Sequence, residues 1–393
     1  SIIYALSLAL NGAGPSSNTH SEILRAITTA SHLQPQQQQP QQQPQQQQLS
    51  EADLNSFLGT TMSLLNGQCP AALNPAAAAA DGTGSQAAAG EAAAAGGEAG
   101  SSSSNSSGPG GSSELILANS IWTAPGTQLK SGYVEEMRTL YQATAREAAG
   151  GAGEVNAWVA GVTRGLIKQL IPNDNFDAIL ANAIYFKGLW ASAFKPHLTQ
   201  PGDFSTSRGT TARVSMMQQT FEPRHNIMSA RKEGVYDAVS LPYRGGDFSA
   251  VALLPAPGVE VAAALREWAA SGPQALKRVG QLRVVLPKFK VSSSMSVTPL
   301  LEQLGVQAAF GPAADFSRMT ESRLHISDVV HKAVVEVDEE GTVAAAATAV
   351  IMLTSVPMPP PELVFNRPFA FMIYHNPTKL PIFTGVVNDP SAT

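Results

Sequence analysis

Few residues of this 393-residue chain are arranged as catalysis or metal binding would require. A serine nucleophile in a G-x-S-x-G turn, a zinc-binding H-E-x-x-H pair, a G-x-x-x-x-G-K phosphate loop and a G-x-G-x-x-G turn would each indicate an enzyme, and none occurs. The seven histidines are scattered, and the single cysteine, Cys69, can form neither an internal disulfide nor a cysteine-based zinc site. The sequence predicts no catalytic residue, metal ligand or cofactor.

The most unusual segment spans residues 337–362. Acidic residues and Gly341 open it and a proline cluster closes it, so both ends are expected at the surface. The middle carries no charge, and residues 342–349 are mostly small. Alanine favours a buried helix, whereas the β-branched residues favour a buried strand. Small side chains also suit a strand that slides between packed neighbours, and the fifteen residues 341–355 would extend over roughly 50 Å.

Two amphipathic helices and several strands are expected around this segment. Helical spacing of apolar residues predicts helices at 133–141 and between 153 and 172. Strand-like segments cover residues 115–123, 176–186, 235–241, 248–254, 282–290, 334–337, 369–374 and 381–387. Because helices and strands do not alternate regularly, the expected class is α+β, with large antiparallel or mixed sheets in one domain.

Two low-complexity segments interrupt this pattern. Residues 34–48 are glutamine and proline, and residues 70–113 are almost wholly Ala, Gly, Ser, Pro and Asn. Neither composition can bury a core, so both are expected to be disordered surface insertions.

The charge and hydropathy patterns limit which kinds of partner are expected. The net charge is −5, with 25 basic and 30 acidic residues mixed along the chain, so nucleic acid is not expected. No apolar run reaches the eighteen residues of a membrane-spanning helix, so no membrane partner is expected either.

Several motifs together resemble the serpin family. Glu339-Glu340-Gly341-Thr342 followed by alanines at 344–347 resembles the hinge of inhibitory serpins, and the run Asn182 to Trp190 resembles the third strand of their sheet A. Residues 214–217, 286–290, 365–369 and 383–390 match further signatures. The resemblance implies one serpin domain over 1–393, with helices packed on three β-sheets, a large central sheet A and an exposed reactive-centre loop at 339–361. Residues 1–7 resemble the interior of the family's second helix, so the first helix is expected to be missing.

The resemblance implies a protease inhibitor that is not itself an enzyme. A target protease, of the serine class or the papain-like cysteine class, would attack the loop, and the cleaved loop would enter sheet A and trap the acyl-enzyme. The hinge would comprise Glu339, Glu340, Gly341, Thr342, Val343, Ala344, Ala345, Ala346, Ala347 and Thr348. On insertion, Thr342, Ala344, Ala346 and Thr348 would face inward. The alternatives are a non-inhibitory serpin acting as carrier or chaperone, and an inactive fragment.

Family spacing places the reactive bond at Ser355-Val356. Because this segment is about two residues longer than is usual, the window also includes Leu353, Thr354, Pro357 and Met358. The window contains no Lys or Arg, so a trypsin-like target is not expected.

The resemblance assigns structural roles elsewhere in the chain. Ser1, Asn182 and His331 would form the shutter where sheet A parts, and Trp190 would lie near the insertion point, with ordinary core packing as the alternative. The helix expected at 50–66 has no Lys or Arg, so no heparin response is expected. The protein is expected to be a monomer. The usual location of family members is the extracellular space, although many act inside cells.

Overall fold

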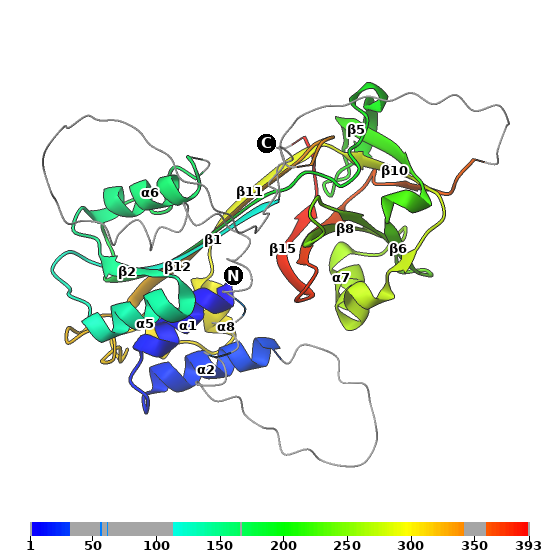
Figure 1. The fold of residues 1–393 in the computed structure, drawn as a ribbon. Coiled ribbons are helices and arrows are strands. Elements are labelled where there is room, and N and C mark those ends of the chain that lie inside the picture. The colour runs from blue at the N-terminus through cyan, green and yellow to red at the C-terminus, as the bar shows by residue number, and fades with distance from the viewer. Residues whose placement is uncertain are drawn as a thin grey trace, which may run out of the picture.

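Three β-sheets with surrounding helices make up the computed structural model, which describes residues 2–31, 56, 61, 113–165, 167–341 and 359–391 (Figure 1). Sheet A has the order β11-β12-β3-β1-β2, sheet B the order β15-β14-β8-β7-β6-β9 and sheet C the order β13-β10-β5-β4. The predicted α+β class with three sheets is therefore confirmed.

The strands of sheet A are β1 (Glu114–Thr123), β2 (Thr144–Glu147), β3 (Ala178–Lys187), β11 (Phe289–Ser296) and β12 (Ile326–Val337). Sheet B contains β6 (Met228–Lys232), β7 (Tyr236–Pro242), β8 (Phe248–Pro255), β9 (Lys277–Arg278), β14 (Phe369–His375) and β15 (Leu380–Val387). Sheet C contains β4 (Gln200–Ser205), β5 (Thr211–Phe221), β10 (Leu282–Pro287) and β13 (Glu362–Val364). The α-helices that lie wholly in the described residues are α1 (Ile2–Gly12), α2 (Asn18–Ser31), α5 (Ser131–Tyr141), α6 (Gly151–Val162), α7 (Val261–Ser271) and α8 (Thr298–Gln303).

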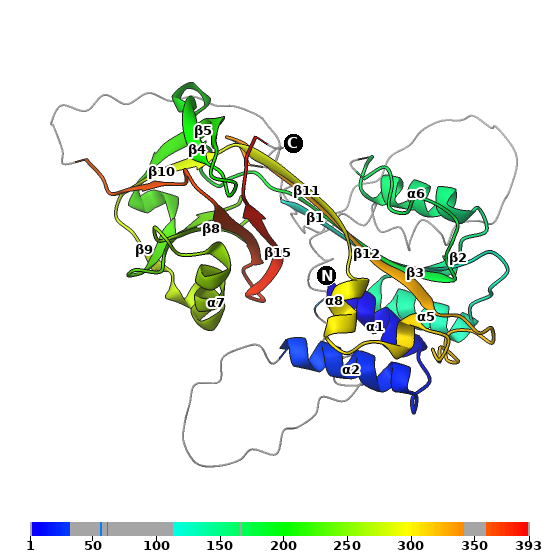
Figure 2. The same ribbon diagram turned by 180° about the vertical axis from the view of Figure 1, so that it is seen from behind.

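Sheet A is covered on both faces, with α6 on one side and α1 and α5 on the other (Figures 1 and 2). Alternate residues of β3 explain this: Ile179 and Ala181 pack with Val155 and Val159 of α6, whereas Leu180 packs in the cluster of α1, α2 and α5. Side chains on both faces of β3 are therefore buried, and its sequence reads as a nearly continuous apolar run.

Three predicted boundaries were wrong. The helix expected between 153 and 172 ends at Val162, because Arg164 and Gly165 adopt positive φ and turn the chain. The expected strand 282–290 divides after Pro287 into β10 of sheet C and β11 of sheet A. The expected strand 334–337 is only the end of β12, whose earlier half carries polar residues that hide its apolar pattern.

Strands β2, β4, β5, β6, β9 and β13 and helices α2, α7 and α8 were not predicted. On β5 the buried residues alternate with exposed ones over only part of its length, which weakens the pattern of period two.

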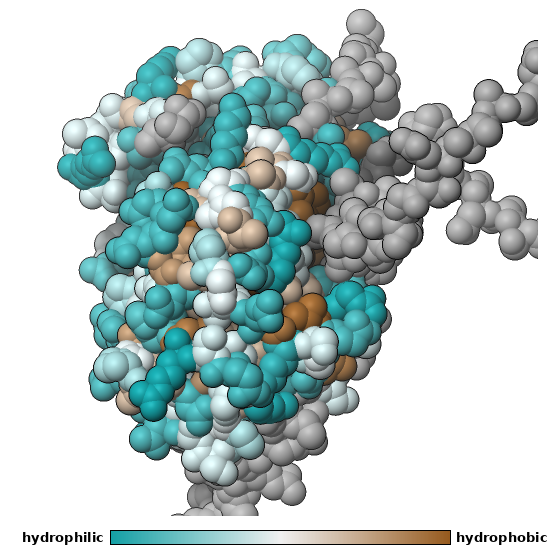
Figure 3. Space-filling model, turned by 90° about the vertical axis from the view of Figure 1, so that its left-hand side faces the viewer, coloured by the Kyte–Doolittle hydropathy of each residue, from teal (hydrophilic) through white to brown (hydrophobic). Residues whose placement is uncertain are grey.

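The surface between these elements is mixed rather than uniformly polar. On the left-hand side of Figure 1, small hydrophobic patches lie among hydrophilic side chains (Figure 3). Only 14% of the chain is charged, so neutral side chains make up much of this face. None of the described helices is long and apolar enough to cross a membrane.

Candidate functional site

The centre of sheet A contains two neighbouring strands that run parallel. Strand β12 pairs with β3 from Ile326 opposite Ala178 to Val334 opposite Tyr185, with one irregularity near Asp328. Their outer neighbours, β11 and β1, pair with them in antiparallel register. A strand entering between β3 and β12 in the opposite direction would replace one parallel pairing by two antiparallel pairings, which are slightly more stable per residue.

A row of polar side chains crosses this pair of strands. Asn119, Asn182 and His331 are register partners on β1, β3 and β12. Asn182 Nδ2 donates to Asn119 Oδ1 at 2.6 Å, and His331 Nδ1 lies 2.6 Å from Asn182 Oδ1. Because Asn182 Oδ1 can only accept, His331 Nδ1 carries the proton. Burial lowers the pKa of His331 to about 4, so the ring is neutral at pH 7.

The structure thus brings together two of the three residues predicted for the shutter, Asn182 and His331. The third, Ser1, lies outside the described residues. Asn119 was not predicted, although its position opposite Asn182 follows once the β1–β3 register is known.

Trp190 lies at the other end of β3, beneath the point where the chain leaves β12. Its ring is 1% exposed and stacks on Tyr243 with centroids 4.4 Å apart. Its Nε1 donates to the Asp338 carbonyl at 3.0 Å, and its backbone N–H donates to the Glu340 carbonyl at 2.8 Å. Trp190 therefore packs as a core residue and also holds the segment that follows β12.

The chain turns sharply after β12. Asp338 Oδ1 accepts from the backbone N–H groups of Glu340 at 3.0 Å and Gly341 at 3.1 Å, and the Asp338 N–H donates to the Gly341 carbonyl at 3.0 Å. Gly341 has φ +130°, and a Cβ there would lie 2.1 Å from the Gly188 carbonyl oxygen. Only glycine fits this position without displacing the backbone of the neighbouring segment.

Glu339 anchors the same turn through its side chain. Lys288 Nζ lies 2.8 Å from Glu339 Oε2, Thr199 Oγ1 donates to Glu339 Oε1 at 2.8 Å, and the Phe194 N–H donates to the Glu339 carbonyl at 2.7 Å. Burial disfavours the charged carboxylate, but the hydrogen bonds from Lys288 and Thr199 hold the pKa of Glu339 below its ordinary value.

The neighbouring acids behave in the opposite way. Burial is the main cause that raises the pKa values of Asp338 and Glu340. The negative charge of Asp338 raises the pKa of Glu340 further, and the charge of Glu339 adds to both shifts. Glu340 Oε2 is buried without a hydrogen-bond partner. The turn therefore concentrates three carboxyl groups, of which Glu339 is the one with a cationic partner within 4 Å.

The far side of the predicted loop is anchored in sheet C. Strand β13 pairs in parallel with β10, and the Arg283 N–H donates to the Pro361 carbonyl at 2.8 Å. The loop assigned to 339–361 is thus described only at its two ends, 339–341 and 359–361. The predicted hinge residues 342–348 and the reactive-bond window, Leu353, Thr354, Ser355, Val356, Pro357 and Met358, lie outside the described residues.

Sequence reasoning missed Lys288, Thr199 and Phe194 as hinge contacts. Lys288 belongs to the motif at 286–290, which could have drawn attention to it, but its partner lies 51 residues further along the chain. No group of three or more His, Cys, Asp or Glu side chains able to hold a metal occurs in the part of the chain that the structure describes.

Comparisons with known proteins define the class to which this site belongs. The family model described as Serpin (serine protease inhibitor) matches residues 79–390. Iris of Ixodes ricinus is 37% identical over 294 residues, covering 70% of this chain and 77% of Iris. The chain belongs to the serpin family.

Other relatives and structures agree with that assignment. The leukocyte elastase inhibitor of Sus scrofa is 37% identical over 253 residues, covering 60% of this chain and 65% of that protein. The thermophilic serpin tengpin in its native state superposes with a TM-score of 0.75 at 25% identity, over 98% of this chain and 86% of tengpin. Human thyroxine-binding globulin, at 21% identity and a TM-score of 0.74 over 99% of this chain and 90% of its own, shows the shared fold alone.

Proposed function

We propose that this chain inhibits serine endopeptidases by trapping them as covalent acyl-enzymes. The observation that carries the proposal is the direct parallel pairing of β3 with β12, next to a chain that leaves β12 and turns back at Gly341. A segment continuing from Gly341 towards the start of β12 would run antiparallel to both strands.

The chemistry in this proposal is supplied by the target. Its serine Oγ attacks the carbonyl carbon of Ser355, the bond from that carbon to the Val356 nitrogen breaks, and the nitrogen leaves as an amine after receiving a proton from the target's general acid. An ester then joins Ser355 to the protease. This chain contributes the cleavable bond and no catalytic group.

Cleavage frees the segment that begins at Thr342 while leaving it attached to β12. Insertion then adds antiparallel hydrogen bonds to both β3 and β12 and carries the bound protease away from the end of sheet A near Gly341. Small side chains at Ala344 and Ala346 would fit the inward face. The uncleaved fold would persist because of a kinetic barrier, since the more stable pairing is reached only after the sheet opens.

The target class follows from the reactive-bond window. Residues 353–358 contain no Lys or Arg, so the proposed target has a small or an apolar specificity pocket. The relative that inhibits leukocyte elastase supports this class. The proposal also allows a papain-like cysteine protease as the target. It includes no acceleration by heparin, because residues 50–66 carry no Lys or Arg.

The test is incubation of the chain with elastase-like, chymotrypsin-like and papain-like proteases, followed by denaturing electrophoresis. We expect a covalent band at the summed mass, with mass spectrometry locating the cut within 353–358. Complete cleavage in that window by every protease without any such band would reject inhibition in favour of a substrate-like serpin.

A further inference from the structure

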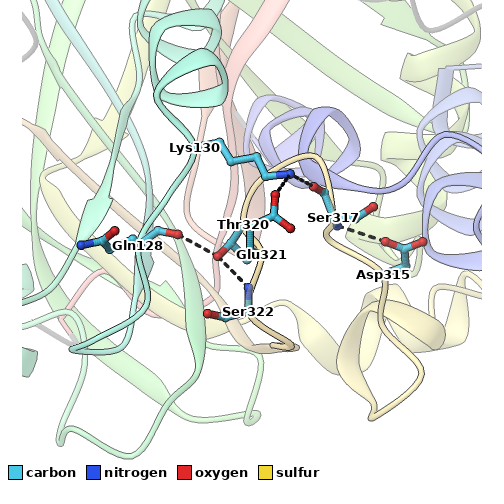
Figure 4. Close-up of polar contacts among 7 residues, drawn as sticks. All are labelled: Gln128, Lys130, Asp315, Ser317, Thr320, Glu321 and Ser322. Carbon is cyan, nitrogen blue, oxygen red and sulfur yellow. Dashed lines mark hydrogen bonds and ion pairs between the residues drawn. The ribbon is translucent and has the colours of Figure 1, made fainter.

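A cluster of polar contacts lies at the end of sheet A opposite Gly341, between the segment after β1 and the segment before β12 (Figure 4). We refer to its members, Gln128, Lys130, Ser317, Thr320 and Glu321, as the basal clamp. None of them lies in a strand, and the residues joined by hydrogen bonds are 187 and 192 positions apart in the sequence.

The contacts of the basal clamp are short and reciprocal. Lys130 Nζ donates to the Ser317 carbonyl at 2.7 Å and lies 2.6 Å from Glu321 Oε1, while its backbone N–H donates to the Met319 carbonyl at 2.8 Å. Thr320 Oγ1 donates to the Gln128 carbonyl at 2.7 Å.

These contacts differ in how strongly they resist separation. The Glu321 side chain is 88% exposed, so its ion pair is screened by solvent and contributes little. Thr320 is 2% exposed, so breaking its bond to the Gln128 carbonyl would leave a buried hydroxyl group without its acceptor. The hydrogen bond of Thr320 is therefore the stronger part of the clamp, and the exposed bond from Lys130 to the Ser317 carbonyl adds to it.

One side of the basal clamp is attached to β1 and β3. The Ala124 N–H donates to the Asp177 carbonyl just before β3 at 2.8 Å, and Thr123 Oγ1 donates to the Thr127 carbonyl at 2.8 Å. Gly126 N–H donates to Glu147 Oε1 of β2 at 2.6 Å. The segment carrying Gln128 and Lys130 must therefore move with β1, β2 and β3.

The other side of the basal clamp leads along the chain into β12 and is also tied to α1. Glu321 precedes the first residue of β12 by five positions, and Arg318 N–H donates to the Gly12 carbonyl at the end of α1 at 3.2 Å. Asp315 Oδ1 accepts from the Ser317 N–H at 3.0 Å. Hydrogen bonds from the side chain of Ser317, chiefly, and from its backbone N–H hold the pKa of Asp315 below its ordinary value. The clamp thus joins the segment that follows β1 to the segment that leads into β12.

Opening of the sheet must reach this end. The segment 342–355 has fourteen residues and β12 has twelve, so an inserted strand that starts near Gly341 extends along the whole of β12. Admitting it requires β3 and β12 to separate by one further strand spacing, about 4.8 Å. A hydrogen bond of 2.7 Å cannot survive a displacement of that size.

We infer that the basal clamp holds the uncleaved sheet closed and is released on insertion, so that Lys130 and Thr320 set the height of the barrier. They are positioning residues and touch neither the loop nor the target. The inference rests on the proposed function, because it presupposes that β3 and β12 part.

The test compares thermal midpoints of the intact chain and of the chain cleaved within 353–358 by any protease that cuts there. The variants are Lys130→Met, which keeps the aliphatic stem, and Thr320→Val, which keeps the shape. Lys232→Met is the matched control, because Lys232 pairs with Glu267 of α7 at a similar exposure, away from sheet A. The Lys130 side chain is 39% exposed, so its variant is expected to fold even if Thr320→Val does not.

We expect the midpoint of intact Lys130→Met and Thr320→Val to fall by about 2–4 °C. The midpoint of the cleaved forms should stay within about 1 °C of the cleaved parent, since the clamp is already open there. On mild heating, the uncleaved variants should also convert about fivefold faster than the uncleaved parent to a form whose loop resists cleavage.

An equal fall in intact and cleaved forms would overturn the inference, because it would show an ordinary structural contact. An unchanged intact midpoint and conversion rate in both variants would overturn it as well. If cleavage leaves the thermal midpoint of the parent chain unchanged, the proposed function is rejected, and the role inferred for the clamp is rejected with it. A rise in the parent with equal falls in the variants rejects the clamp alone.

Discussion

His331 on β12 and Asn182 on β3 are joined by a hydrogen bond of 2.6 Å across the two strands that must part if a new strand enters sheet A. The bond needs a proton on Nδ1, and the low pKa of the ring leaves Nε2 unprotonated at pH 7. Because this hydrogen bond joins two paired strands, it is present only while β3 and β12 lie next to each other, and so it reports whether the sheet is closed.

Acidification should weaken the closed sheet through His331. Its pKa falls from 6.5 to about 4 on folding, so between these values the unfolded chain binds more protons and stability declines as pH falls. Above pH 6.5 this contribution is constant. Denaturant titrations of the intact chain at pH 7 and pH 5 should show a lower midpoint at pH 5.

Replacement of His331 by Asn provides the control for that effect, since Asn cannot titrate. The drop between pH 7 and pH 5 should shrink in His331→Asn. An undiminished drop would show that other groups are responsible for the pH dependence.

Loss of the Glu339 carboxylate should loosen the hinge. In Glu339→Gln the charged partner of Lys288 disappears while one acceptor for Thr199 remains, and we expect a loss of about 1–2 kcal/mol in the uncleaved state. Chemical denaturation of the intact chain measures it. Because the pKa of Glu339 is depressed on folding, its contribution is present above the ordinary pKa of glutamic acid and is lost as pH falls below it. A variant as stable as the parent at pH 7 would contradict the anchoring role.

Substitution of Gly341 by Ala adds only a methyl group but should strongly destabilise the intact chain. The added Cβ would meet the Gly188 carbonyl oxygen at 2.1 Å, and φ +130° is strained for any other residue. We expect intact Gly341→Ala to lose about 2–3 kcal/mol in chemical denaturation. Gly280→Ala is the matched control, since a Cβ there meets nothing within 4 Å. Equal stabilities of the two variants would refute the steric account.

The two faces of the proposed inserted strand can be told apart by charge. Arginine in place of Thr342 would place an unpaired charge on the inward face, which should stall insertion and turn the inhibitor into a substrate. Arginine in place of Val343 would face outward and should leave trapping largely intact. The ratio of covalent complex to cleaved product on denaturing gels measures the difference, and equal ratios for both variants would contradict the predicted parity.

Local sequence was sufficient to find some members of the site and insufficient for others. Glu339, Gly341 and Trp190 stand in short motifs, and the structure places all three around one turn. Lys288, Thr199 and Asn119 meet their partners only through strand register and sheet order, which no local pattern encodes. The same reason explains why the contact between Lys130 and Ser317, 187 residues apart, could not be predicted.

Strand assignments show a similar limit. The buried β3 was recognised because its apolar run is nearly continuous, whereas most of β12 was missed because Asp328, His331 and Lys332 interrupt the apolar pattern. Those polar residues contact the neighbouring segments across the sheet, since Lys332 Nζ donates to the Gln169 carbonyl at 2.6 Å. The polar residues that tie β12 to its neighbours are thus the ones that obscured the strand.

A crystal structure of the chain after cleavage within 353–358 would test the central claim most directly. The account predicts a sixth strand in sheet A, formed by residues that follow Gly341 and lying antiparallel between β3 and β12. It also predicts that the bond between His331 and Asn182 is broken. A cleaved chain in which β3 and β12 remain paired from Ala178 to Val334, as they are now, would contradict it.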